Sequence, residues 1–427
     1  MKTLIKNGYL ITVDASDTCG EGCVLVENDT IAYAGPEENA PQVKADRVID
    51  AKGGIIMPGF VNTHTHVPMT MMRGYADDLS LMDWLQNHIW PAEAKLTEEA
   101  VYWSSMLAMC EFAAAGVTCF SDMYNFNAQI AKAARDAGLR ALIAAAVLDI
   151  DGGGDARLKN TEEFFDLVKD ERRITAVIGP HAEYTVSPGM FGKVRDFAAK
   201  HGARIHVHIS ETQQEHADCL ARHGKTPIGL LQSLGVLEVP VMAAHCVYVS
   251  DDDMDIMAKH GVSVMSCPGS NLKLGSGVPR VAEMIKRGVN VSCATDGAAS
   301  NNNLSMMEEM TLTALLQKGV CKDPSLIPAK TAVRIATANG AAALGMSHLT
   351  GSLEAGKQAD LIVIRTDGVR WCPRANLLNH LVYSGSDSDV ALTMVDGDIV
   401  YQDGRIMFGD VEEIKAKASQ YAAKLFA

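Results

Sequence analysis

The chain lacks any long uninterrupted hydrophobic segment. Its 427 residues contain no run of about 18 uncharged apolar residues, which is the length that a membrane-spanning helix needs. Residues 1–8 hold two lysines and lack the apolar core of a signal peptide. We therefore expect a cytoplasmic protein with no membrane-spanning segment.

Positive charge is also scarce. The sequence has 38 Lys and Arg residues against 52 Asp and Glu residues, which gives a formal net charge of -14. A nucleic-acid backbone or an anionic membrane surface would repel such a chain. We expect neither as a partner, and small molecules remain the expected ligands.

Cysteine pairs suited to a four-ligand zinc site are missing too. Cys19 and Cys23 stand close together, but no second pair completes such a site. Reduced thiols inside apolar strands behave as small hydrophobic groups. We therefore expect burial without reactivity for Cys119, Cys246, Cys267 and Cys293.

What the sequence does contain is a repeating alternation of strands and helices. Apolar, β-branched runs bounded by Gly, Pro or Asp recur between helix-like stretches, as in parallel strands that are buried on both faces. We predict an α/β fold in which eight such strands close into a (β/α)₈ barrel over residues 56–350. The expected strands are 56–62, 117–122, 141–148, 174–179, 204–209, 239–244, 262–267 and 289–294.

The two ends of the chain do not follow this rhythm. Residues 1–55 and 351–427 alternate short strands with turns, and residues 411–426 have the pattern of an amphipathic helix. Chain ends often lie close together in space. We predict that both ends build one small β-sandwich domain beside the barrel, with the helix at its end.

Polar side chains end five of the eight predicted strands. His64 and His66 end the first strand, and their i, i+2 spacing directs both to one side. Active sites of such barrels gather at the carboxyl ends of the strands, so these side chains should converge. The others are His181 after the fourth strand, His206, His208 and Glu211 at the fifth, His245 at the sixth and Asp296 at the eighth.

Each of these residues taken alone has a structural explanation. His181 suits a turn, His245 a hydrogen-bonded core position, and Asp296 a turn or helix cap. Five strand ends that carry such groups together favour a common site. His206 keeps a structural interpretation, because it lies one barrel layer deeper than His208.

A catalytic zinc ion needs three or four nitrogen or oxygen ligands and one open position for water. Glu211 stands where a proton carrier is required, and His245 on the next strand could hold the water. Such a site also accepts Fe²⁺ or another divalent ion. The candidate ligands are His64, His66, His208 and Asp296.

These motifs resemble the amidohydrolase superfamily, in its mononuclear-metal deaminase and chlorohydrolase branch. The resemblance runs along essentially the whole chain and rests on residues 58–66, 206–211, 244–247 and 294–297. It implies the same metal ligands, with Glu211, His245 and Asp296 as catalytic residues. The binuclear branch carries a carboxylated lysine at the end of strand four, where this chain has His181. We therefore expect one zinc ion per subunit.

Within that branch the chain is most similar to the 5'-methylthioadenosine/S-adenosylhomocysteine deaminases. Residues 270–277 and 296–304 carry the likeness, together with Trp84 and the segment 91–93. The resemblance implies that Glu93 accepts hydrogen bonds from ribose hydroxyls, that Arg157 binds a distal carboxylate and that Trp84 contacts the substrate. It further implies contacts from His181 to the sugar and from Glu211 and Asp296 to the purine.

These segments also have structural explanations. Residues 300–303 would cap a following helix, Trp84 fits a helix packing face, and Arg157 could be solvated in a glycine-rich loop. The chain also departs from the family pattern, because Ala145 stands where a second carboxylate-binding arginine is expected. That departure favours substrates without an amino-acid tail.

We predict hydrolytic deamination of a 5'-modified adenosine to its inosine analogue and ammonia. Glu211 would protonate N1, while Asp296 with His245 would take the proton of the attacking water. A deaminase of a free base or pterin, or a chlorotriazine-type aminohydrolase, is the alternative, and Glu93 favours the nucleoside. A non-catalytic scaffold is disfavoured because every expected ligand is present. We also expect a homo-oligomer.

Overall fold

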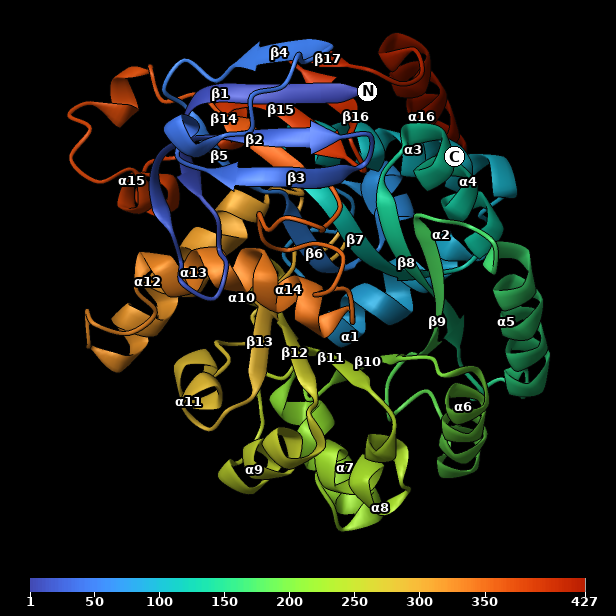
Figure 1. The fold of residues 1–427 in the computed structure, drawn as a ribbon. Coiled ribbons are helices and arrows are strands. Elements are labelled where there is room, and N and C mark those ends of the chain that lie inside the picture. The colour runs from blue at the N-terminus through green and yellow to red at the C-terminus, as the bar shows by residue number, and fades with distance from the viewer. Residues whose placement is uncertain (427) are drawn as a thin grey trace.

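An eight-stranded parallel barrel forms the centre of the molecule (Figure 1). The computed structural model describes residues 1–426. The strands follow one another in chain order around the barrel, which confirms the predicted (β/α)₈ fold. They are β6 (Phe60–Thr65), β7 (Val117–Tyr124), β8 (Arg140–Val147), β9 (Ile174–Pro180), β10 (Ile205–Ile209), β11 (Val241–His245), β12 (Ser263–Ser266) and β13 (Asn290–Cys293).

The first and last barrel strands meet at the mouth through a few specific bonds. The Asp296 backbone N–H donates to the carbonyl oxygen of His64 over 3.0 Å. One layer deeper, the Asn62 side chain donates to Thr295 Oγ1 and accepts from the Thr295 backbone N–H. These bonds hold together the two strands that carry His64 and Asp296.

Helices cover the outside of the barrel. Helix α3 begins after Thr97, whose side chain accepts from the Ala100 backbone N–H. No helix in residues 1–426 is long and apolar enough to cross a membrane. The longer barrel helices are α3 (Glu98–Ala114), α4 (Asn127–Ala137), α5 (Gly154–Val168), α6 (Pro188–His201), α7 (Gln213–His223), α8 (Pro227–Ser233), α9 (Asp251–His260), α12 (Met306–Cys321) and α13 (Ala329–Ala336).

Shorter helical segments complete the barrel and its loops. Two of them, η2 and η3, follow the first strand and lead towards α3. The segments are η2 (Val67–Met72), α1 (Leu81–Asp83), η3 (Trp84–Ile89), α2 (Trp90–Glu93), η4 (Val236–Glu238), α10 (Pro268–Lys273), α11 (Val281–Lys286) and α14 (Ala338–Ala343). Outside the barrel lie η1 (Glu37–Asn39), η5 (Val369–Trp371), α15 (Leu377–Tyr383), η6 (Asp387–Asp389) and α16 (Val411–Phe426), the last at the predicted range.

Strands from both chain ends form a second, nine-stranded mixed sheet, as predicted. In Figure 1 β1, β2 and β3 lie in front of β14 and β15, and the two groups share a separate apolar core. The domain limits at residues 55 and 350 stay predictions. The strands are β1 (Lys2–Ile11), β2 (Cys19–Glu27), β3 (Thr30–Gly35), β4 (Arg47–Asp50), β5 (Ile55–Pro58), β14 (Leu361–Ile364), β15 (Val390–Val395), β16 (Asp398–Gln402) and β17 (Arg405–Ile406).

The predicted first barrel strand, 56–62, is wrong in its bounds. The chain changes sheets at Gly59, so that β5 pairs with β1 and β14 while β6 pairs with β7. A Cβ atom at Gly59 would lie 2.1 Å from Thr118 Cγ2, so only glycine fits this crossing. Both halves of the run are apolar because each is buried in its own sheet.

A buried ion cluster joins the two parts. Arg140 on β8 donates to Asp360 Oδ2 over 2.7 Å and to Asp396 Oδ1 over 3.0 Å. Both carboxylates belong to loops of the terminal sheet, and all three side chains are almost fully buried. The barrel that carries the site is therefore anchored to the sheet by paired charges.

Candidate active site

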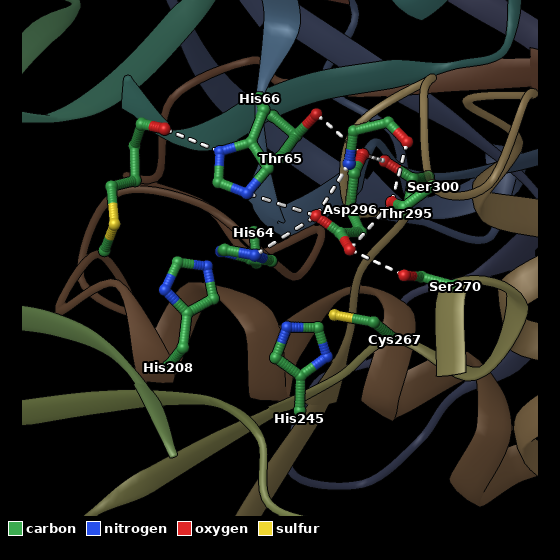
Figure 2. A network of polar contacts seen from close by, with 12 residues as sticks. His64, Thr65, His66, His208, His245, Cys267, Ser270, Thr295, Asp296 and Ser300 are labelled. Atoms are coloured by element: carbon green, nitrogen blue, oxygen red, sulfur yellow. Dashed lines mark hydrogen bonds and ion pairs between the residues drawn. The ribbon is translucent and has the colours of Figure 1, made fainter. Parts of the chain in front are cut away.

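Three imidazoles and one carboxylate meet at the carboxyl end of the barrel (Figure 2). The ligand atoms of His64, His66 and His208 lie within 4.8 Å of one another. Asp296 Oδ1 lies 3.4 Å from His64 Nε2 and 3.3 Å from His66 Nε2. The structure thus brings together all four side chains that the sequence suggested as metal ligands.

The orientation of two imidazoles is fixed by backbone carbonyls. His66 Nδ1 donates to the Met123 oxygen over 2.6 Å, and His208 Nδ1 donates to the His181 oxygen over 2.7 Å. A carbonyl can only accept, so Nδ1 carries the proton in both rings. Nε2 is therefore left as a free lone pair that faces the other ligands.

His64 is oriented by another histidine. Its Nδ1 lies 2.7 Å from His206 Nε2, and His206 Nδ1 lies 3.2 Å from Ser121 Oγ. His64 Nε2 is buried and has no hydrogen-bond partner among residues 1–426. Burial lowers the pKa of His64 to about 4, which keeps the ring neutral. An orphaned buried nitrogen is costly, and a divalent metal ion would satisfy it.

Asp296 presents one oxygen to the imidazoles and is held by three donors. Oδ1 accepts from the Gly297 backbone N–H over 2.7 Å. Oδ2 accepts from Ser270 Oγ over 2.6 Å and from Ser300 Oγ over 2.9 Å. Burial opposes its charge, but these three hydrogen bonds favour the ionised form of Asp296. The donor set of three neutral imidazoles and one carboxylate therefore fits a divalent metal.

Glu211 and His245 stand next to each other beside this centre. Glu211 Oε2 lies 3.7 Å from His245 Nε2, and Glu211 Oε1 accepts from Ser276 Oγ over 3.2 Å. His245 Nδ1 donates to Asn271 Oδ1 over 2.9 Å. Burial raises the pKa of the Glu211 carboxyl. A raised pKa suits a carboxyl that delivers a proton near neutral pH.

Another buried carboxylate holds the backbone at Glu211. Glu215 accepts from the Ser210 backbone N–H over 2.8 Å and from the Glu211 backbone N–H over 2.7 Å. Ser210 has a φ of 49°, in the left-handed region. Glu215, on α7, therefore fixes the turn that directs Glu211 into the site.

One pocket of about 950 Å³, open solvent at its mouth included, connects this centre to the surface. Pockets of this size hold drug-sized or nucleoside-sized ligands. Glu93 ends the series of short helices α1, η3 and α2, and burial raises its pKa to about 7. The predicted substrate-binding residues that line the pocket are Trp84, Glu93, Arg157, His181, Glu211 and Asp296.

Residues 55–400 match the model of the amidohydrolase family. The chain belongs to this family. One amidohydrolase relative, a 5-methylthioadenosine/S-adenosylhomocysteine deaminase of Caldanaerobacter subterraneus subsp. tengcongensis, is 40% identical over 100% of this chain and 99% of its own. A 5'-deoxyadenosine deaminase of Methanosarcina mazei is 42% identical over 99% of this chain and 98% of its own.

A solved structure of similar sequence also matches. The adenosine deaminase of Xanthomonas campestris with bound zinc is 34% identical to this amidohydrolase. The two superpose with a TM-score of 0.96 over 99% of this chain and 98% of the other. A metal site in the histidine cluster is consistent with that zinc-bound relative.

Sequence reasoning missed several residues that support the catalytic groups. Ser270, Asn271 and Ser276 contact Asp296, His245 and Glu211, and all three come from the segment 270–277. That segment resembles the deaminases, but Ser270 and Asn271 lie in α10 and Ser276 in the loop after it, and residue spacing does not reveal which groups they contact. His206 is buried one layer below the site, as predicted, and the sequence did not reveal that it contacts His64.

Two explanations from the sequence are wrong. Ser300 does not cap the next helix, because Ser305 caps α12 and Ser300 contacts Asp296. Arg157 lies inside α5 and not in a glycine-rich loop.

The four cysteines expected to be buried are buried, and all are free thiols: Cys119, Cys246, Cys267 and Cys293.

Proposed function

We propose that this amidohydrolase deaminates 5'-modified adenosines by hydrolysis, which yields the inosine analogue and ammonia. The observation that carries the proposal is one pocket that joins three of the candidate metal ligands, His66, His208 and Asp296, to Glu93. The centre suits water activation, and a carboxylate such as Glu93 suits the vicinal hydroxyls of a ribose. The full-length likeness to 5-methylthioadenosine/S-adenosylhomocysteine and 5'-deoxyadenosine deaminases supports this substrate class.

The metal is a single zinc ion per chain, held by His64, His66, His208 and Asp296. A bound zinc ion lowers the pKa of a water molecule towards 7 and so supplies a nucleophile at neutral pH. His181 stands where a second ion would need a lysine ligand, which supports a count of one. Metal analysis of the purified protein measures how many ions each chain binds and which metal they are. Sedimentation measures whether the protein forms the expected homo-oligomer.

The protein groups divide the proton transfers. Glu211, whose raised pKa keeps it protonated further towards neutral pH, donates to N1 of the purine ring. Asp296 stays ionised and accepts one proton from the attacking water, with His245 beside it, and the other proton of that water restores the acid form of Glu211. The proton on Asp296 then passes to the amino group, which leaves as ammonia. His181 contacts the sugar, and Trp84 contacts the substrate from the pocket wall.

The test is ammonia release by zinc-loaded protein from a panel of substrates. The panel holds 5'-methylthioadenosine, S-adenosylhomocysteine, 5'-deoxyadenosine, adenosine, guanine and an aminotriazine, with metal-free protein as the control. We expect turnover of adenosine derivatives that disappears without metal. Turnover of guanine or the triazine alone would contradict the ribose role of Glu93 and the proposal with it.

A further inference from the structure

Arg157, a positively charged side chain in the pocket wall, already forms an ion pair with a carboxylate of the protein. Among residues 1–426, Arg157 is the one lysine or arginine that lines the pocket. Its Nη1 and Nη2 donate to Asp151 Oδ1 and Oδ2, each over 2.6 Å. Nη1 also donates to the Leu148 carbonyl oxygen over 2.8 Å. A carboxylate of the protein therefore holds the group that a substrate carboxylate would need.

Asp151 is itself fixed and charged. It lies in the loop between β8 and α5, and its Oδ1 also accepts from the Gly153 backbone N–H over 2.9 Å. The hydrogen bonds from Arg157 hold the pKa of Asp151 well below its usual range. Both groups therefore stay charged near neutral pH, and their charges cancel. The pair presents no net charge to the pocket.

A count of donors shows what Arg157 still offers. Guanidinium carries five N–H groups, and three of them donate to Asp151 and Leu148. The two that remain can bond a neutral acceptor. An incoming carboxylate would meet the charge of Asp151 beside them, and like charges at such distances repel. It would also lose its hydration without gaining a free cation.

A 5' substituent is the part of the substrate that this pair would face. Deamination at C6 requires the base to lie at the metal ligands, and Glu93 holds the ribose. The 5' position is at the opposite end of the nucleoside from C6. The remaining pocket wall is largely apolar and includes Leu81, Leu85, Ile89 and Leu148. An uncharged methylthio or deoxy group suits such a wall.

We propose that Asp151 is a specificity-determining residue, which neutralises Arg157 and so selects adenosines with an uncharged 5' group over those that end in a carboxylate. This inference rests on the proposed function. It predicts that the wild-type protein uses 5'-methylthioadenosine more efficiently than an analogue whose 5' thioether ends in a carboxylate and carries no ammonium group. It also predicts that loss of the Asp151 charge alone reverses part of that preference.

The test compares kcat/KM for the two substrates in zinc-loaded wild type and Asp151→Asn. We expect the ratio of kcat/KM for the carboxylate analogue to kcat/KM for 5'-methylthioadenosine to rise about tenfold in the variant, because one unit charge no longer opposes the tail. Added salt should reduce that gain, since the new attraction is partly exposed to solvent. The matched control is Asp155→Asn, four residues further on in α5, which pairs with Lys193 outside the pocket and should leave the ratio unchanged.

A double variant, Asp151→Asn with Arg157→Met, should not show the rise in the kcat/KM ratio. That rise depends on the Arg157 guanidinium that Asp151→Asn frees. An unchanged ratio in Asp151→Asn, or a wild type equally efficient with both substrates, would overturn the inference while deamination itself stands. If Asp151→Asn fails to fold, Asp151→Ser removes the same charge and allows the same comparison. Absence of turnover with every adenosine derivative would instead overturn the proposed function, and this inference with it.

Discussion

The metal end of the pocket and its substrate wall are built differently. The metal end, His64, His66, His208 and Asp296, comes from strand termini, and a fixed partner holds the Nδ1 atom of each of its imidazoles. The substrate wall, which we define by the proposed substrate contacts Trp84, Glu93 and Arg157, comes from short helical turns and the start of α5. The Arg157 side chain is 31% exposed, whereas that of His64 is fully buried.

The difference separates chemistry from specificity. A rigid barrel sets the distances that proton transfer and metal binding need, while loops and short helices change without disturbing them. The comparison predicts that substitutions at the metal end affect all substrates alike. Substitutions in the substrate wall should affect substrates according to what each carries at its ribose and 5' end.

The largest effect should come from the proton carrier. Glu211→Gln keeps the shape of the side chain but removes its acid, so kcat should fall about a thousandfold for every substrate. Zinc content should stay at the wild-type level, because Glu211 is not among the ligands. Glu238→Gln, an exposed carboxylate near His260, is the control and should keep full activity. An active Glu211→Gln protein would remove this residue from the mechanism.

The next effect should distinguish nucleosides from bare rings. Glu93→Gln weakens hydrogen bonds that a charged acceptor makes to ribose hydroxyls, which should lower kcat/KM for 5'-methylthioadenosine about thirtyfold. Any residual activity on adenine, which has no ribose, should not change. Glu98→Gln is a suitable control, because Glu98 contacts Gln129 on the surface near by. An equal fall in kcat/KM with both substrates would show that Glu93 acts in folding or in the reaction itself and not in ribose binding.

A smaller effect, on zinc affinity, is expected at His206, which contacts the proposed ligand His64. His206→Phe removes the partner of His64 Nδ1 and should weaken zinc binding about tenfold, as measured by competition with a chelator. Ser121→Ala removes only the outer contact to His206 and should have a weaker effect. Equal zinc affinity in wild type and His206→Phe would show that His64 needs no such support.

The smallest effect concerns pH. Burial raises the pKa of Glu93 to about 7, so the carboxylate forms only as pH rises through that value. An ionised Glu93 accepts from both ribose hydroxyls, and KM for 5'-methylthioadenosine should therefore fall about fivefold between pH 6 and pH 8. Glu93→Gln should flatten this trend in KM. A KM that rises over the same interval would contradict the assignment.

The sequence predicted the metal end better than the substrate wall, for physical reasons. His64, His66 and His208 follow from strand periodicity and from the rule that barrel strands end at one mouth. The pairing of Arg157 with Asp151 depends on side-chain conformation, which residue spacing does not reveal. The change of sheets at Gly59 was hidden because the apolar run continues through it, although Pro58-Gly59 was a signal for a break.

The most direct test of the whole account compares two substrates that share one base. Ammonia release by the zinc-loaded protein is measured with 5'-methylthioadenosine and with adenine, which the metal end would treat alike. We predict that the nucleoside reacts far more efficiently, because the metal end acts only on a base that the substrate wall holds by its ribose. Equal or faster release from adenine would contradict the division of the pocket into a metal end and a substrate wall.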